Sequence, residues 1–178
     1  MASTKSLTTM FVASFLFVII LYNIMDIEAR ITNEMLDTLF PSQLAPSQRW
    51  AILVAGSKHY QNYRHQSDIC HAWQVLTDKG VPQENIVVFM YDDIAYHDMN
   101  PFQGVLRNSP STDGFNVYEG VTKDYVGEDV TSGNIVSAFL GNANPGGVKG
   151  SGKIINSGAN DYVFFYFSGH GEIGSLGK

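Results

Sequence analysis

Three short apolar runs place the tightest limit on how this chain can fold. They are residues 51–55 (Ala-Ile-Leu-Val-Ala), 85–91 (Asn-Ile-Val-Val-Phe-Met-Tyr) and 162–167 (Tyr-Val-Phe-Phe-Tyr-Phe). The runs are continuous rather than alternating, which is typical of parallel strands covered on both faces. Apolar residues recur at helical spacing over residues 65–78 and 131–140. The order of these elements predicts an α/β fold built on a parallel sheet with three core strands.

The remaining segments are expected to connect these elements. Residues 98–129 are rich in Asn, Pro, Gly and Asp, and we expect a surface loop with a small hairpin around Val117 and Tyr118. Thr131 is placed to cap the second helix. The glycine-rich residues 146–152 predict a flexible connection before the third strand. A strand of Tyr, Val and Phe left at the sheet edge would be an aggregation-prone template, so we also expect that the domain is incomplete.

The N-terminal residues are expected to lie outside the folded domain. Lys5 precedes a nearly unbroken apolar stretch over residues 7–25, which predicts a secretory signal peptide within residues 1–29. A membrane anchor is the alternative, because the stretch approaches the roughly 20 residues that a spanning helix needs. Residues 30–48 are polar and contain proline, which favours a short propeptide or linker. The folded domain then comprises residues 49–178.

Composition narrows the choice of partners. The chain carries 17 acidic and 11 basic residues, a formal net charge of -6, and no Lys/Arg cluster. We therefore expect no nucleic-acid partner. Its single cysteine excludes an internal disulfide framework, so stability must come from the packed core. No motif predicts a cofactor or a metal site.

His170 is the leading candidate for chemistry. It lies between Gly169 and Gly171, directly after the third apolar run. A strand that delivers a histidine to the carboxyl edge of a parallel sheet presents it where α/β enzymes bind ligands. An imidazole with an ordinary pKa of about 6.5 can accept and return a proton near neutrality. The N–H of Gly171 is a candidate oxyanion donor. An exposed loop histidine without a role is the alternative.

A second polar group follows the first run and is expected at the same edge. Asn62 can orient a catalytic imidazole, and Arg64 can bind a carbonyl or carboxylate. The alternative is an ordinary helix start, in which Asn62 is the cap and Arg64 is solvated. Cys70 follows an apolar helical position, and burial there would make it structural and inert. Asp92 and Asp93 are interpreted as the start of a loop rather than as cation ligands.

The chain resembles the legumains, or vacuolar processing enzymes, and the resemblance extends from about Trp50 to Leu176. The blocks that carry it are Trp-Ala-Ile-Leu-Val-Ala-Gly-Ser (50–57), Asn-Tyr-Arg-His-Gln-Ser-Asp-Ile-Cys-His-Ala-Trp-Gln (62–74), Asn-Ile-Val-Val-Phe-Met-Tyr-Asp-Asp-Ile-Ala (85–95) and Val-Tyr-Glu-Gly-Val-Thr-Lys-Asp-Tyr-Val-Gly-Glu-Asp-Val-Thr (117–131). It implies a caspase-like α/β fold and a cysteine endopeptidase that cuts after Asn, and less readily after Asp. Such enzymes are secretory precursors that are activated in the vacuole or lysosome. Their partners would be proteins with exposed Asn, and no stable membrane association would remain after signal removal.

The resemblance also implies roles for individual residues. His170 matches the catalytic base, Gly171 the oxyanion donor and Asn62 the support of the base. Arg64 matches the floor of the pocket for Asn, with His65 beside it.

Two departures from the family pattern accompany these matches. Gly169 stands where the family usually has Asp, and the family nucleophile, a cysteine on the following strand, is expected beyond Lys178. The chain as given is therefore expected to be inactive alone. A non-catalytic truncated product or a pseudogene fragment is the alternative.

Overall fold

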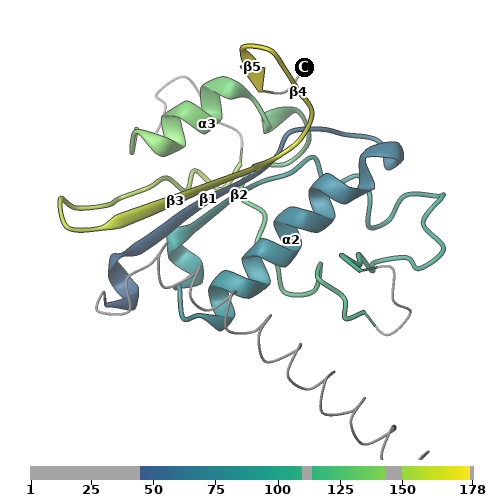
Figure 1. The fold of residues 1–178 in the computed structure, drawn as a ribbon, viewed down its shortest axis with the longest axis horizontal. Coiled ribbons are helices and arrows are strands. Elements are labelled where there is room, and N and C mark those ends of the chain that lie inside the picture. Colours follow the sequence, from purple (N-terminus) through teal and green to yellow (C-terminus); the bar gives the residue numbers. More distant parts are fainter. Residues whose placement is uncertain (1–44, 110–113, 143–149, 177–178) are drawn as a thin grey trace, which may run out of the picture. The chain divides into compact units, whose positions relative to one another are not determined.

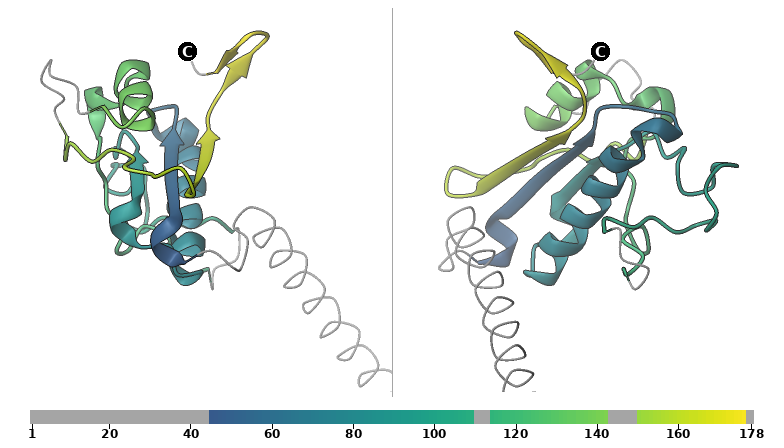
Figure 2. Two further views of the ribbon diagram at one scale, coloured as in Figure 1. Left: turned by 90° about the vertical axis from the view of Figure 1, so that its left-hand side faces the viewer. Right: turned by 45° about the vertical axis from the view of Figure 1, so that its right-hand side comes forward.

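The computed structural model describes residues 45–109, 114–142 and 150–176, and it shows helices on both faces of a central sheet (Figure 1). Helix α2 (Tyr63–Asp78) covers one face and α3 (Ser132–Phe139) covers the other. Figure 2 shows the same separation from two further directions. This arrangement confirms the α/β fold that the sequence predicts.

The sheet consists of three parallel strands, β1 (Arg49–Ala55), β2 (Ile86–Phe89) and β3 (Tyr162–Ser168), in the order β2-β1-β3. In β1, Ala51 pairs with Ile86 of β2, and Ala55 pairs with Ser168 of β3. The predicted strands are confirmed, with shifts of one or two residues at their ends. All three carboxyl ends meet at one edge of the sheet.

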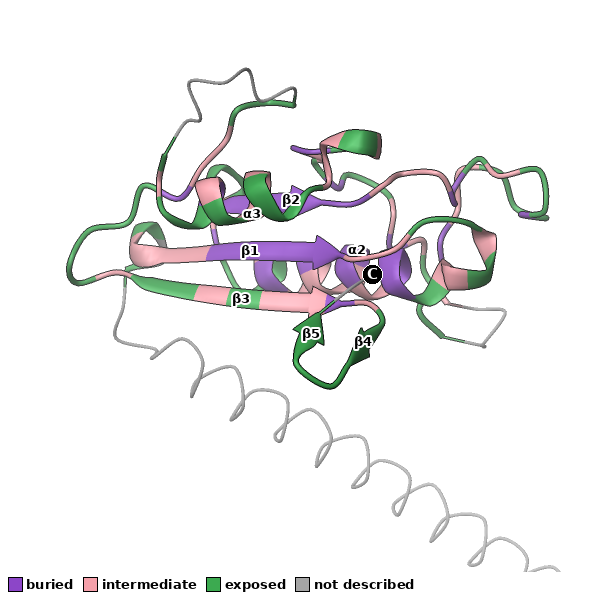
Figure 3. Ribbon diagram, turned by 90° about the horizontal axis from the view of Figure 1, so that it is seen from above, coloured by how far each residue is buried: buried purple, intermediate pink, exposed green. Residues whose placement is uncertain are grey.

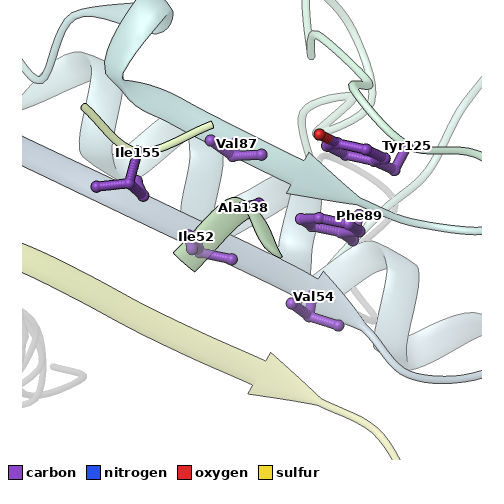
Figure 4. Close-up of a cluster of buried hydrophobic side chains, with 7 residues drawn as sticks. All are labelled: Ile52, Val54, Val87, Phe89, Tyr125, Ala138 and Ile155. Carbon is purple, nitrogen blue, oxygen red and sulfur yellow. The ribbon is translucent and has the colours of Figure 1, made fainter. Parts of the chain in front are cut away.

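The core lies around β1, whose alternate side chains serve the two faces. Ile52 and Val54 pack with Val87 and Phe89 on the side of α3, where Tyr125, Ala138 and Ile155 complete a buried cluster (Figure 4). Because strand side chains alternate, Ala51, Leu53 and Ala55 face α2. All five residues from Ala51 to Ala55 have no exposed surface. Burial on both faces explains why the sequence of β1 reads as one continuous apolar run.

Both predicted helices form, and their ends follow from the local sequence. Helix α2 buries Ile69, Trp73 and Leu76 against the sheet and ends before Gly80, which has a φ of 80°. Helix α3 begins after Thr131, whose side chain accepts a hydrogen bond from the Asn134 N–H. The predicted cap at Thr131 is therefore confirmed.

Strand β3 pairs only with β1 among the described residues, and its other edge is open (Figure 3). Tyr162, Val163 and Phe165 are 46%, 37% and 41% exposed, in contrast to the buried β1. Phe165 contacts Phe139 of α3 edge to face. The sequence predicts this unprotected edge, and the strand contains neither a charged residue nor a proline that would oppose pairing.

The loop between β2 and α3 corrects one prediction, because residues 117–120 form turns and not a hairpin. Val117 is buried, its N–H donates to the Leu106 carbonyl, and its own carbonyl accepts from Gln74. The apolar character of Val117 therefore serves burial against α2 rather than strand pairing.

Short elements complete the described part of the chain. They are the 3-10 helices η1 (Pro46–Gln48), η2 (Tyr60–Asn62), η3 (Gln83–Asn85) and η4 (Gly127–Asp129), and the antiparallel strands β4 (Gly171–Glu172) and β5 (Ser175–Leu176). The predicted signal peptide, most of the predicted linker and most of residues 146–152 lie outside the described residues. Within the described ranges, no helix has the length and apolar character needed to cross a membrane.

Candidate active site

His170 and Asn62 meet at the carboxyl edge of the sheet. The Nε2 atom of His170 lies 2.8 Å from Oδ1 of Asn62, although the two residues are far apart in the sequence. Nδ2 of Asn62 donates to the Lys58 carbonyl at 2.8 Å, which leaves Oδ1 as the acceptor toward His170. Nε2 of His170 therefore carries the proton, and the lone pair of Nδ1 is free to accept one.

Asn62 stands at the N-cap position of α2, but its side chain makes no capping hydrogen bond. Its two polar atoms contact Lys58 and His170 instead. The helix-cap alternative is therefore wrong for the Asn62 side chain. The side chain connects the loop after β1 to the end of β3.

His65 is buried beside His170. Its ring lies edge to face against that of His170 with centroids 4.9 Å apart, and its Nδ1 atom shares a hydrogen bond with the Ser57 hydroxyl. Burial, assisted by the positive charges of Arg64 and His170, lowers the pKa of His65. The lowered pKa favours the neutral form of His65 in this pair with Ser57. The sequence places His65 near the site but gives no sign of this contact with Ser57.

Arg64 lies in the first turn of α2 with an exposed side chain. One guanidinium N–H, at Nη1, lies 3.5 Å from the Gln61 carbonyl. Arg64 thus lies at the same edge as Asn62 and is open to a ligand. Its planar fork of donors suits a carbonyl or carboxylate oxygen.

Gly171 begins β4, and the two-residue strands β4 and β5 form a small hairpin after His170. The sequence analysis does not foresee this hairpin. Gly174 has a φ of 81° at its turn, and that glycine was the available signal. The hairpin extends beyond the carboxyl end of β3 (Figure 2).

Gly169 leaves space that the Phe167 ring occupies. A Cβ atom built at Gly169 would lie 2.7 Å from Cζ of Phe167, and one at Gly56 would lie 2.3 Å from the same atom. The ring thus fills the space between two glycines of neighbouring strand ends. A side chain at position 169 would therefore collide with the Phe167 ring unless that ring moved.

We expect Gly169→Ala to lower the free energy of unfolding by about 1–3 kcal/mol, because the added methyl group displaces the Phe167 ring. Gly158→Ala is the control, since its Cβ would meet its nearest neighbour at 3.8 Å, and it should change stability by no more than about 0.5 kcal/mol. Urea unfolding of both variants measures the difference. Equal effects at the two positions would contradict this account of the packing.

Cys70 is the only cysteine of the sequence and lies inside the core. It has no exposed surface, and burial raises the pKa of its thiol to about 12. A thiol with that pKa is not a nucleophile near neutral pH. Its placement agrees with the structural role that the sequence predicts.

Asp92 and Asp93 form parts of the surrounding loops. Asp93 accepts hydrogen bonds from the His59 N–H and the Gln66 amide, both at 2.7 Å, and Asp92 accepts from the Tyr118 hydroxyl. The contact between Asp93 and the His59 N–H holds the loop that carries Asn62. Within the described ranges, no three His, Cys, Asp or Glu side chains are grouped so that they could hold a metal ion.

A cavity of about 500 Å³ opens at the same edge of the sheet, toward α3. Gly56 and Ser57 from the end of β1, Ser132 of α3 and Glu172 of β4 contribute to its lining. His170, Asn62 and Arg64 do not line it. The cavity therefore lies beside the pair of His170 and Asn62 and does not contain it.

The comparisons with known proteins assign the chain to a class of peptidases. Residues 49–178 match the Peptidase C13 family, and the chain belongs to that family. It is 58% identical to a protein named Legumain of Canavalia ensiformis over 130 residues, which are 72% of this chain and 26% of the relative. The vacuolar-processing enzyme of Phaseolus vulgaris is also 58% identical, and the beta-isozyme of Arabidopsis thaliana is 55% identical, with the same coverage. The chain spans about a quarter of the length of these relatives.

Proposed function

We propose that residues 49–178 form the first part of a cysteine endopeptidase that cuts after Asn, with His170 as general base. The observation that carries the proposal is the 2.8 Å contact between His170 and Asn62 at the carboxyl edge of a parallel sheet. Asn62 orients the imidazole so that Nδ1 faces the reaction. Gly171 offers its N–H to the developing oxyanion.

Substrate selection is proposed to reside in Arg64, with His65 beside it. The guanidinium donates to the side-chain carbonyl of a substrate Asn. It binds an Asp side chain only weakly, once that carboxyl group is protonated. His65 is buried, and burial lowers its pKa, which disfavours a second cation in the pocket. Proteins with exposed Asn are the proposed partners.

The isolated chain is proposed to be inactive. Its single thiol, that of Cys70, is buried and has a pKa of about 12, so Cys70 is not the proposed nucleophile. We further propose a signal peptide within residues 1–29 and a destination in the vacuole, because several relatives are named vacuolar-processing enzymes. Sequencing the full transcript tests the proposed source of the nucleophile. A reading frame that continues into a strand ending in Cys supports the proposed peptidase, and a stop after Lys178 supports a non-catalytic product.

A chimera tests the proposed activity. Residues 49–178 replace the matching segment of the Canavalia ensiformis relative, and cleavage of an Ala-Ala-Asn fluorogenic peptide is measured at acidic pH. We expect the chimera to cleave this peptide and the isolated 178-residue chain to show no cleavage. A folded chimera without activity would contradict the proposal for this segment.

Arg64→Ala in the chimera should lower kcat/KM for the Asn peptide by about 10- to 150-fold. A hydrogen bond from a charged donor is worth about 1.5–3 kcal/mol, and 1.4 kcal/mol corresponds to a factor of ten. Arg64→Lys keeps the charge but not the planar fork, so most of the loss should remain. Lys58→Ala is the control, since it removes a cation from the same edge. A loss of the same size in Lys58→Ala would argue against Arg64 as the specificity residue.

A further inference from the structure

A chain of polar contacts connects the end of β3 to helix α2, one helical turn beyond Arg64 and His65. The Ser168 hydroxyl donates to Oδ2 of Asp68 at 2.7 Å, and Nδ2 of Asn108 donates to Oδ1 of the same carboxylate at 2.8 Å. Ser168 is 8% exposed and stands two residues before His170. Asp68 is thus held from both sides by groups that come from distant parts of the sequence.

The partner on the far side of Asp68 is itself fixed. Oδ1 of Asn108 lies 3.0 Å from Nδ1 of His71, and its Nδ2 atom also reaches the Ser67 hydroxyl at 3.1 Å. Ser67 in turn donates to the Arg107 carbonyl at 2.8 Å. Asn108 therefore presents its amide donor to Asp68 in one orientation. With one donor on each oxygen, the Asp68 carboxylate is held in a single rotamer.

These contacts bear on the site because its two halves come from different segments. His170 follows β3, whereas Arg64 and His65 belong to α2. The bond between Asn62 and His170 is one connection between the segments, and the bond between Asp68 and Ser168 is a second. The backbone of Ser168 is already paired with β1, and the bond to Asp68 adds a side-chain connection from this strand end to α2.

We propose that Asp68 is a positioning residue, which sets His170 against His65 and Arg64 by binding Ser168. The negative charge of Asp68 also raises the pKa of His65, in opposition to burial, so the carboxylate acts on the same group through its field. The meaning of the inference rests on the proposed function, because His170 and Arg64 must work together there. Its geometry can be tested without any activity.

The test is the nuclear Overhauser cross-peak between the ring protons of His65 and His170 in the isotopically labelled 178-residue chain. The two rings lie 4.9 Å apart, so the folded protein should give this cross-peak. Asp68→Ala and Ser168→Ala should each lose it, while the core resonances of β1 and β2 stay in place. Ser168→Thr retains the hydroxyl and should restore it.

Asp78→Ala is the matched control, because it removes an exposed carboxylate from the end of the same helix. It should leave the cross-peak intact. Retention of the cross-peak in both Ser168→Ala and Asp68→Ala would overturn the proposal, as would unfolding of both variants, which would mean a general role in stability. If only Asp68→Ala unfolds, the Ser168→Ala and Ser168→Thr pair decides. None of these results depends on cleavage by the chimera, so failure of the proposed function is recognised separately.

Discussion

His170→Ala in the chimera is expected to lower kcat/KM for the Asn peptide by about 10²–10⁴-fold, the usual contribution of a positioned general base. The imidazole is held by Asn62 with its Nδ1 lone pair free, and alanine offers no acceptor at that place. Added imidazole should restore part of the rate, because it supplies the missing base without changing the fold. Progress curves with and without imidazole measure both effects.

Two outcomes would contradict this expectation. A chimera that keeps its full rate in the His170→Ala variant would exclude His170 as the base. A variant that is inactive because it has unfolded would be recognised by its circular dichroism. His170 is exposed, so its removal leaves no cavity in the core, and the variant should keep its fold.

Phe89→Ala is expected to have the largest effect on stability, lowering the free energy of unfolding by about 3–5 kcal/mol. Phe89 has no exposed surface and stacks on Tyr125 with ring centroids 4.2 Å apart and planes inclined by 4° (Figure 4). The free energy of unfolding of a typical domain is only about 5–15 kcal/mol, and small domains lie at the low end of this range. Urea unfolding followed by tryptophan fluorescence measures the change.

Phe115→Ala provides the control for this prediction. Phe115 is 60% exposed, and its ring makes a T-shaped contact with the His71 ring. The same substitution there should lower the free energy of unfolding by no more than about 1 kcal/mol. A loss at Phe115 as large as that at Phe89 would show that the cluster around Val87 and Phe89 is not the main source of stability.

The sequence was sufficient for the three core strands, for the two helices and for the edge at which the site lies. Continuous apolar runs identified β1, β2 and β3, and Thr131 identified the start of α3, because these signals are local. The meeting of Asn62 and His170 also followed from a general rule, since the carboxyl ends of parallel strands share one edge.

Contacts between distant side chains could not be predicted in this way. The packing of Phe167 between Gly56 and Gly169, and the bond between Asp68 and Ser168, depend on the exact register of β1 against β3. The hairpin predicted around Val117 was wrong for the same reason, because burial against α2 determined the conformation there.

The pairing of β1 with β3 has a consequence for the order of folding. Arg49 pairs with Tyr162, more than one hundred residues later in the chain, whereas β1, α2 and β2 are consecutive. During synthesis at about 5–20 residues per second, β1 waits roughly 6–23 s for its second neighbour to be made. Because such distant pairing is slow to form, we expect β1, α2 and β2 to fold first and β3 to add to them afterwards. We therefore expect the contact between His170 and Asn62 to form after the contacts among β1, α2 and β2.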